Sequence, residues 1–124
     1  ILYGESLGTA VAIHTAQSKN FSGIILEAPF TSMVDLGQKY YPFFPVKFLL
    51  KDKYESKKKL NLINSPVLVM HGEKDKIVPF YMGKQIFETL PSPKFRYFNH
   101  QDDHMMEYNQ DLIDSIKNFI DQLN

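Results

Sequence analysis

The chain has 124 residues, 44% of them hydrophobic, and its ten Phe and seven Tyr supply enough bulk for the core of one globular domain. Fourteen Lys and Arg balance fourteen Asp and Glu, so the charge does not favour nucleic acid or an acidic membrane surface as a partner. Because the chain has no Cys, disulfides, thiolate catalysis and zinc–thiolate sites are excluded, and the compartment stays open.

The first pattern in the chain is Gly4-Glu5-Ser6-Leu7-Gly8. Ile1–Tyr3 before it is predicted to end a strand, and the alanine-rich segment after it, to Ala16, predicts a helix packed closely on a sheet. Glycines on both sides of a serine permit a tight strand-to-helix turn that exposes the hydroxyl for nucleophilic attack. The alternative is a glycine-bounded turn with an ordinary helix-capping serine.

Three short apolar stretches predict buried strands: Ser22–Pro29, Pro66–His71 and Phe95–Phe98. Between the last two, Pro79–Leu90 predicts a helix with proline in its first turn. A final helix is predicted from an apolar stripe at helical spacing, formed by Tyr108, Leu112, Ile116, Phe119, Ile120 and Leu123. Strands and helices therefore alternate, which predicts an α/β fold. No apolar run approaches the length of a membrane span.

The segment between Pro29 and Pro66 is the least regular. A short helix at about Ser32–Tyr40, a bend at the prolines of Tyr40–Pro45 and one or two further helical turns are expected there, because each proline restricts the residue before it. The aromatic residues of this segment fit either the core or an acyl pocket. The run Lys57–Lys59 fits a solvated helix face better than a binding patch.

Two loops after predicted strands carry side chains suited to work with Ser6. Asp75 follows the strand that ends at His71, and His104 follows the strand Phe95–Phe98. Such loops, at the carboxyl ends of parallel strands, are where α/β sheets carry their sites. A carboxylate there can orient an imidazole, and the order Ser6, Asp75, His104 is the order found in α/β-hydrolases. On its own, Asp75 also fits a solvated loop residue or an acid at a helix start.

The stretches GESLGTAVA, LEAPFTSM, PVLVMHGEKDKIVP and DDHMMEY together resemble the C-terminal half of an α/β-hydrolase-fold serine hydrolase. They are most similar to the alpha/beta-hydrolase domain-containing proteins related to serine peptidases of the prolyl oligopeptidase kind. The resemblance covers essentially the whole chain. It implies that Ser6 is the nucleophile, Asp75 the orienting acid and His104 the general base, with the backbone N–H of Leu7 as one oxyanion donor. It implies no cofactor. The residues themselves predict no metal site, because the histidines fall in separate loops and lack the helical two-histidine pattern.

The histidine loop departs from the family pattern. Family members commonly carry Gly-His or Gly-Gly-His, whereas Asp102 and Asp103 precede His104 here, which can reshape the loop and acidify the site. His100 is the rival general base, and Glu27 at the end of a predicted strand is an alternative acid.

The remaining candidates are expected to be structural. His71 is expected to shape the Asp75 loop through hydrogen bonds, although a polar role beside the site stays open. His14 is expected to be a packing or surface residue. Met105 and Met106 fit either the border of a pocket or the filling of gaps.

The resemblance implies about four mostly parallel strands with flanking helices. It also implies a single partial domain over residues 1–124, with a short helical insertion at about 31–64. In the family, four strands and a loop with the second oxyanion donor precede the serine elbow. We therefore expect an exposed edge on the strand before Ser6, and either self-association along it or completion by an N-terminal fragment.

The function that the resemblance implies is a serine hydrolase, impaired in the isolated chain, which cleaves an ester, thioester or amide through an acyl-enzyme without a cofactor. Acyl transfer to an acceptor other than water uses the same triad. A non-catalytic remnant or split-gene fragment that binds an N-terminal partner is the alternative.

Overall fold

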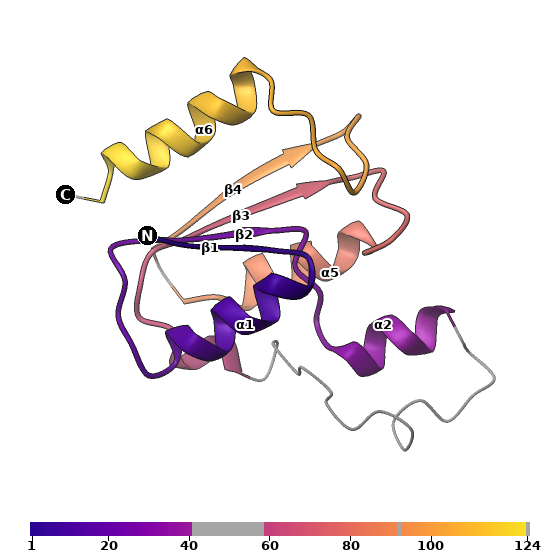
Figure 1. Cartoon of the computed structure of the whole chain (residues 1–124), viewed down its shortest axis with the longest axis horizontal. Helices are drawn as coiled ribbons and strands as arrows, with labels where there is room; N and C mark the ends of the chain where they lie inside the picture. The colour runs from indigo at the N-terminus through magenta and orange to yellow at the C-terminus, as the bar shows by residue number, and fades with distance from the viewer. Residues whose placement is uncertain (41–58, 92, 124) are drawn as a thin grey trace.

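The computed structural model describes residues 1–40, 59–91 and 93–123 (Figure 1). In chain order the elements are β1 (Leu2–Glu5), α1 (Leu7–Ala16), β2 (Ile24–Glu27), α2 (Met33–Tyr40), the 3-10 helix η1 (Leu60–Leu62), β3 (Val67–Gly72), α5 (Phe80–Thr89), β4 (Lys94–Asn99) and α6 (Gln110–Asp121). The predicted α/β alternation is confirmed. The bend and the aromatic segment expected after Tyr40, and all of Lys57–Lys59 except its last residue, lie outside the described residues.

The four strands form one parallel sheet in the order β1-β2-β3-β4. All four therefore run in the same direction, and the turns that follow them gather at the carboxyl ends of the strands, called the carboxyl edge of the sheet below (Figure 1). The parallel pairing places Glu5 opposite Glu27 and Gly72 opposite Asn99. The turn after β1, the loop after β3 and the loop after β4 are thus brought to the same end of the molecule.

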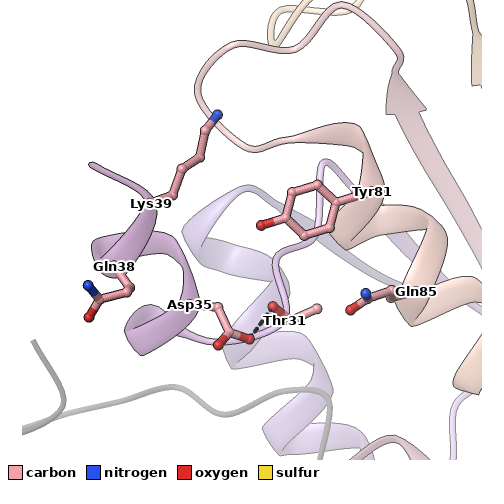
Figure 2. Close-up of a pocket in the computed structure, with 6 residues that line it drawn as sticks. All are labelled: Thr31, Asp35, Gln38, Lys39, Tyr81 and Gln85. Carbon is pink, nitrogen blue, oxygen red and sulfur yellow. Dashed lines mark hydrogen bonds between the residues drawn. The ribbon is translucent and has the colours of Figure 1, made fainter. Parts of the chain in front are cut away.

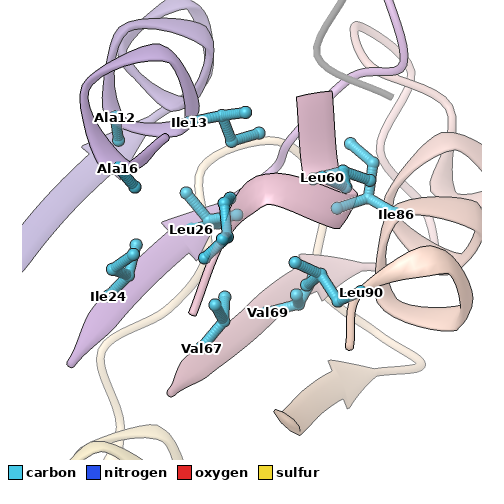
Figure 3. Close-up of a cluster of buried hydrophobic side chains, with 11 residues drawn as sticks. Ala12, Ile13, Ala16, Ile24, Leu26, Leu60, Val67, Val69, Ile86 and Leu90 are labelled. Atoms are coloured by element: carbon cyan, nitrogen blue, oxygen red, sulfur yellow. The ribbon is translucent and has the colours of Figure 1, made fainter. Parts of the chain in front are cut away.

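Helices cover both faces of the sheet. Alternate strand residues point to opposite faces, so Ile24 and Leu26 of β2 lie in one core cluster while Ile25 lies in the other. The first cluster packs under α1 and α5, as Figure 3 shows for side chains of α1, β2, β3 and α5. The second packs under α6 through Leu112 and Phe119. Burial on both faces explains why β2 and β3 read as continuous apolar runs.

Of the six residues predicted to form the apolar stripe of the last helix, four pack against the sheet and two do not. Leu112, Ile116, Phe119 and Leu123 pack against the sheet, but Ile120 is 40% exposed. Tyr108 lies before the helix, which begins after Asn109, whose side chain caps it by accepting a hydrogen bond from the Leu112 backbone N–H at 3.1 Å.

The outer side of β1 and α1 is apolar and uncovered in the described part of the chain. β1 ends the sheet, and Leu7 and Val11 of α1 are 53% and 55% exposed. A helix that is apolar on both sides is normally buried on both sides. None of the described helices is long and apolar enough to cross a membrane.

Candidate active site at the carboxyl edge of the sheet

Ser6 occupies a strained turn between β1 and α1. Its backbone has φ 50° and ψ −115°, a region that residues with a side chain seldom adopt. Its N–H donates to the carbonyl of Glu27 at 2.8 Å, and its own carbonyl accepts from the backbone N–H and hydroxyl of Thr9 at 3.0 and 2.6 Å. The Ser6 side chain makes no capping hydrogen bond to α1. Ser6 is therefore not an ordinary helix-capping serine, and the turn is held by backbone groups and the Thr9 hydroxyl instead of by the Ser6 side chain.

Gly4 lets the strand and the helix approach closely. A Cβ atom at Gly4 would lie 2.6 Å from the carbonyl oxygen of Gly8 and 3.0 Å from the Ala12 side chain. Any larger residue would push α1 away from β1 and open the turn at Ser6. At Gly8, by contrast, a Cβ would meet nothing within 4 Å. The first glycine of the pattern is thus required by local packing in the described residues.

Asp75 and His104 are hydrogen-bonded partners. The Nδ1 atom of His104 lies 2.8 Å from Oδ2 of Asp75, whose side chain is completely buried, while the His104 side chain is 14% exposed. The other carboxylate oxygen of Asp75 accepts the backbone N–H groups of Ile77 and Val78, both at 2.8 Å. The carboxylate is held on both oxygens, so its orientation toward the imidazole is fixed.

These contacts keep Asp75 ionised. Burial by itself raises the pKa of a carboxyl group, but hydrogen bonds from His71, His104 and the two backbone N–H groups outweigh it and lower the pKa of Asp75 from 3.8 to about 2. An ionised carboxylate accepts the Nδ1 proton of His104. The Nε2 atom of His104 is then the nitrogen left with a lone pair, which is the form that a general base needs.

His71 is a second donor to the same carboxylate. Its ring is fully buried, and its Nε2 atom lies 2.9 Å from the Val78 carbonyl and 3.2 Å from Oδ2 of Asp75. A carbonyl accepts only, so Nε2 carries the proton. Among the described residues Nδ1 has no hydrogen-bond partner, and a Cβ atom at Gly83 would collide with it. The structural role predicted for His71, in shaping the Asp75 loop, is confirmed by these contacts.

The loops after β3 and β4 are joined through their backbones. Glu73 N–H donates to the Asn99 carbonyl at 2.8 Å, and Lys74 N–H donates to the Asp102 carbonyl at 3.0 Å. Gly72 permits this crossing, because a Cβ atom there would collide with the carbonyl oxygens of Asp102 and Asp103. Gly72 is a residue that was not predicted from the sequence to matter for the site. Its signal was the His-Gly pair before the acidic loop.

Ser6 lies at the same edge of the sheet as Asp75 and His104, because each follows the carboxyl end of a parallel strand (Figure 1). Among the contacts of the described residues there is no hydrogen bond between the Ser6 hydroxyl and His104. The structure thus joins two of the three predicted side chains directly and brings the third to the same edge. Leu7 is the first residue of α1, where backbone N–H groups have no partner within the helix.

The rival candidates lie elsewhere. The His100 side chain is 89% exposed and contacts Glu73 rather than Asp75. Glu27 accepts from two tyrosines, Tyr3 and Tyr108, rather than from a histidine. Neither residue forms the contact expected of a base or an orienting acid, so the alternatives at His100 and Glu27 are not supported.

The other singled-out residues have separate surroundings. Asp103 accepts the Met105 N–H at 3.1 Å, while one carboxylate oxygen of Asp102 is buried without a partner in the part of the chain that the structure describes. Met106 is in the core and Met105 is 74% exposed, so the two methionines divide between the two expected roles. His14 is at the surface beside Lys59.

Two cavities bear on the site. One of about 380 Å³ is bordered by His104 together with Lys74, Lys76, Ile77, Gln101, Asp103 and Met105. A larger one of about 490 Å³ lies between α2 and α5 and is lined by Thr31, Asp35, Gln38, Lys39, Tyr81 and Gln85 (Figure 2). Of these two, the cavity bordered by His104 adjoins the hydrogen-bonded pair of His104 and Asp75. Within residues 1–40, 59–91 and 93–123, no group of three or more His, Asp or Glu side chains is arranged to hold a metal ion.

Comparison with known proteins gives a consistent result. The family model described as "Prolyl oligopeptidase family" matches residues 1–123. An uncharacterised protein of Mycobacterium tuberculosis is 33% identical over 123 residues, which cover 95% of this chain and 43% of that protein. Human alpha/beta hydrolase domain-containing protein 17B is 31% identical over 97 residues, covering 75% of this chain and 31% of that protein. The chain therefore spans less than half the length of these relatives.

Among solved structures, the esterase RhEst1 from Rhodococcus sp. superimposes with a TM-score of 0.72 at 16% identity. The match covers 99% of this chain and 65% of the esterase. At this level of identity the match shows likeness of fold alone.

Proposed function

This chain belongs to the prolyl oligopeptidase family, within the α/β-hydrolase fold, and from that premise we propose that it carries the catalytic residues of a serine hydrolase. Ser6 is the nucleophile, His104 the general base and Asp75 the acid that orients His104. The substrate is an ester, thioester or amide with an acyl group that passes through Ser6. No cofactor takes part in this reaction.

The hydrogen bond between His104 Nδ1 and Asp75 Oδ2 is the observation that carries the proposal. It fixes the imidazole tautomer with Nε2 as the basic nitrogen, and it comes from loops at the same sheet edge as Ser6. The strained backbone of Ser6 adds support, because strain of this kind clusters at catalytic turns and the serine side chain is not used for capping.

The reaction follows from these roles. The Ser6 hydroxyl attacks the acyl carbon as His104 Nε2 takes its proton, and the carbonyl oxygen becomes an oxyanion that accepts from the Leu7 backbone N–H. The tetrahedral intermediate collapses as His104 gives the proton to the leaving alcohol, thiol or amine. Water, deprotonated by His104, then hydrolyses the acyl-enzyme and frees Ser6. An acceptor other than water at this last step would make the same site an acyltransferase.

A segment beyond the described residues is needed to complete the site in this proposal. In the fold, the second oxyanion donor comes from a loop after an earlier strand, and loss of one such donor costs about 10²–10³ in turnover. We propose that an N-terminal segment pairs along the free edge of β1 and covers Leu7 and Val11, or that two copies associate there. Without it, the site is expected to be a poor catalyst.

The same free edge supports the second candidate, a non-catalytic chain that acts by binding a partner strand. The two candidates differ in whether Ser6 is needed for turnover. In the full-length protein, Ser6→Ala is expected to abolish hydrolysis of a p-nitrophenyl ester while the melting temperature is kept. Ser18→Ala, an exposed serine at the end of α1, is the matched control and should leave the rate unchanged. Equal rates in both variants would leave the binding role as the better account.

A further inference from the structure

A buried carboxylate lies next to the serine turn and is not used by the proposed chemistry. Glu27 ends β2 and is 2% exposed. The hydroxyls of Tyr3 and Tyr108 both donate to its Oε1 atom at 2.5 Å, and the two hydroxyls lie 2.6 Å from each other. These three residues are called the Glu27 cluster below. They come from β1, from β2 and from the loop between β4 and α6.

The two tyrosine hydroxyls of the Glu27 cluster stabilise the buried carboxylate. A buried carboxylate is costly unless hydrogen bonds replace its water, and two phenol hydroxyls do so here. Burial is the largest cause that raises the pKa of Tyr3 and of Tyr108, and the hydrogen bond to Glu27 is the second largest. Both hydroxyls therefore keep their protons at neutral pH and act as donors. Charge-assisted hydrogen bonds of this kind are stronger than neutral ones.

Glu27 touches both halves of the candidate site. Its backbone carbonyl accepts the N–H of Ser6 at 2.8 Å, and its side chain accepts the hydroxyl of Tyr108, which follows His104 in the same loop. One residue thus connects the serine turn to the loop that carries the histidine. The link joins positions 81 apart in the sequence.

Elsewhere along the loop that carries His104, hydrogen bonds join it to the Asp75 loop, not to the strands beside Ser6. At its start, the loop is tied to the Asp75 loop through the carbonyls of Asn99 and Asp102. In its middle, His104 contacts Asp75. The hydroxyl of Tyr108 joins the far end of this loop to the strands beside Ser6, through its hydrogen bond to Glu27 of β2 and its 2.6 Å contact with the Tyr3 hydroxyl of β1.

We infer that the hydrogen bond from Tyr108 to Glu27 positions His104 relative to Ser6 and so sets the rate at which Ser6 is acylated. This inference rests on the proposed function. Tyr108 is a positioning residue, since it acts through the loop of His104 and does not touch the reacting atoms.

Tyr3 supplies a matched control. Its hydroxyl donates to the same oxygen at the same distance, so loss of either hydroxyl removes one donor from Glu27. Tyr3, however, lies in β1, which backbone pairing with β2 already holds in place. Tyr3→Phe removes one donor from Glu27 and the contact with the Tyr108 hydroxyl, but it leaves the hydrogen bond from Tyr108 to Glu27 that joins the histidine loop to β2. Tyr108→Phe removes both contacts of its hydroxyl and so releases the loop.

The experiment compares the full-length wild type with Tyr108→Phe and Tyr3→Phe. The readouts are the rate at which a fluorophosphonate probe labels Ser6, kcat and KM for a p-nitrophenyl ester, and the low-field NMR signal of the His104 Nδ1 proton. Tyr108→Phe is expected to lower the labelling rate and kcat by about tenfold, with KM little changed and a broadened Nδ1 signal. Tyr3→Phe is expected to lose a similar amount of thermal stability but to label within about twofold of the wild type.

A purely structural role for Tyr108 would give equal labelling rates in the two variants, and that result would overturn the inference. If Tyr108→Phe does not fold, Glu27→Gln decides instead, because it keeps an acceptor oxygen but removes the charge. It should label about fivefold more slowly than the wild type, and an unchanged rate would overturn the inference. Failure of the wild type itself to label at Ser6 would reject the proposed function, and the inference with it. Labelling of the wild type with equal rates in the two tyrosine variants would reject the inference alone.

Discussion

His104 and Asp75 are 29 positions apart in the sequence, yet Nδ1 of one lies 2.8 Å from Oδ2 of the other. The contact depends on the neighbouring strands β3 and β4, which end side by side and whose loops are joined by backbone hydrogen bonds. The carboxylate has no exposed surface, and four donors surround it.

Asp75→Asn is expected to lower kcat by about 10⁴-fold with the fold retained, because an amide in this place no longer selects the His104 tautomer with a free Nε2. The measurement is ester turnover by the full-length protein, with circular dichroism to check folding. Asp103→Asn is the control, since Asp103 adjoins His104 in the chain but accepts from Met105 N–H instead. Activity of Asp75→Asn near that of the control would remove Asp75 from its proposed role.

His104→Gln and His100→Gln separate the two candidate bases. His104→Gln is expected to lose at least about 10⁴-fold in kcat, because it removes the base that the proposal assigns to the Ser6 proton. His100→Gln is expected to keep wild-type activity, since its side chain is 89% exposed and contacts Glu73. The reverse ranking of the two variants in a turnover assay would make His100 the base.

Acid should weaken the fold through Asp75. Its pKa is lowered from 3.8 to about 2 in the folded chain, so the ionised carboxylate stabilises the fold above pH 4, and that stabilisation is lost as the pH falls toward 2. The contribution amounts to about 2 kcal/mol of unfolding free energy at neutral pH. Denaturant unfolding across this range should therefore show a steeper acid loss for the wild type than for Asp75→Asn. Parallel curves for the two proteins would contradict the assignment.

Gly72→Ala is expected to separate the two loops of the site. The added methyl group meets the carbonyl oxygens of Asp102 and Asp103, which cannot move without breaking the hydrogen bond from Lys74 N–H. We expect a loss of about 1–3 kcal/mol in unfolding free energy, together with a fall in kcat. Gly8→Ala, which adds its methyl group in open space among the described residues, is the stability control. Equal melting temperatures for the two variants would show that the crossing tolerates a side chain.

Much of this arrangement could be predicted from the sequence because its signals are local. Continuous apolar runs bounded by glycine or proline marked β2 and β3, and the glycines around Ser6 marked the turn. The order of Ser6, Asp75 and His104 then indicated three loops at one sheet edge. The pairing of Asp75 with His104 needed the family resemblance as well, because spacing alone left His100 open.

The Glu27 cluster could not be predicted in the same way. Its partners are 24 and 81 positions from Glu27, so the contacts appear only when the strand register and the path of the last loop are known. Helical periodicity counted Tyr108 as an apolar residue of the final helix. In the structure its hydroxyl reaches a carboxylate instead, and the cap at Asn109 starts the helix after it. A hydrophobic pattern treats tyrosine as an apolar ring. It carries no information on whether the hydroxyl will donate a hydrogen bond to a buried carboxylate.

The most direct test of the central claim is to map the residue that a fluorophosphonate probe modifies in the full-length protein, by mass spectrometry of its peptides. The account predicts one adduct on Ser6, formed quickly in the wild type, slowly in His104→Gln and not at all in Ser6→Ala. An adduct on another residue, or labelling that survives Ser6→Ala, would contradict it.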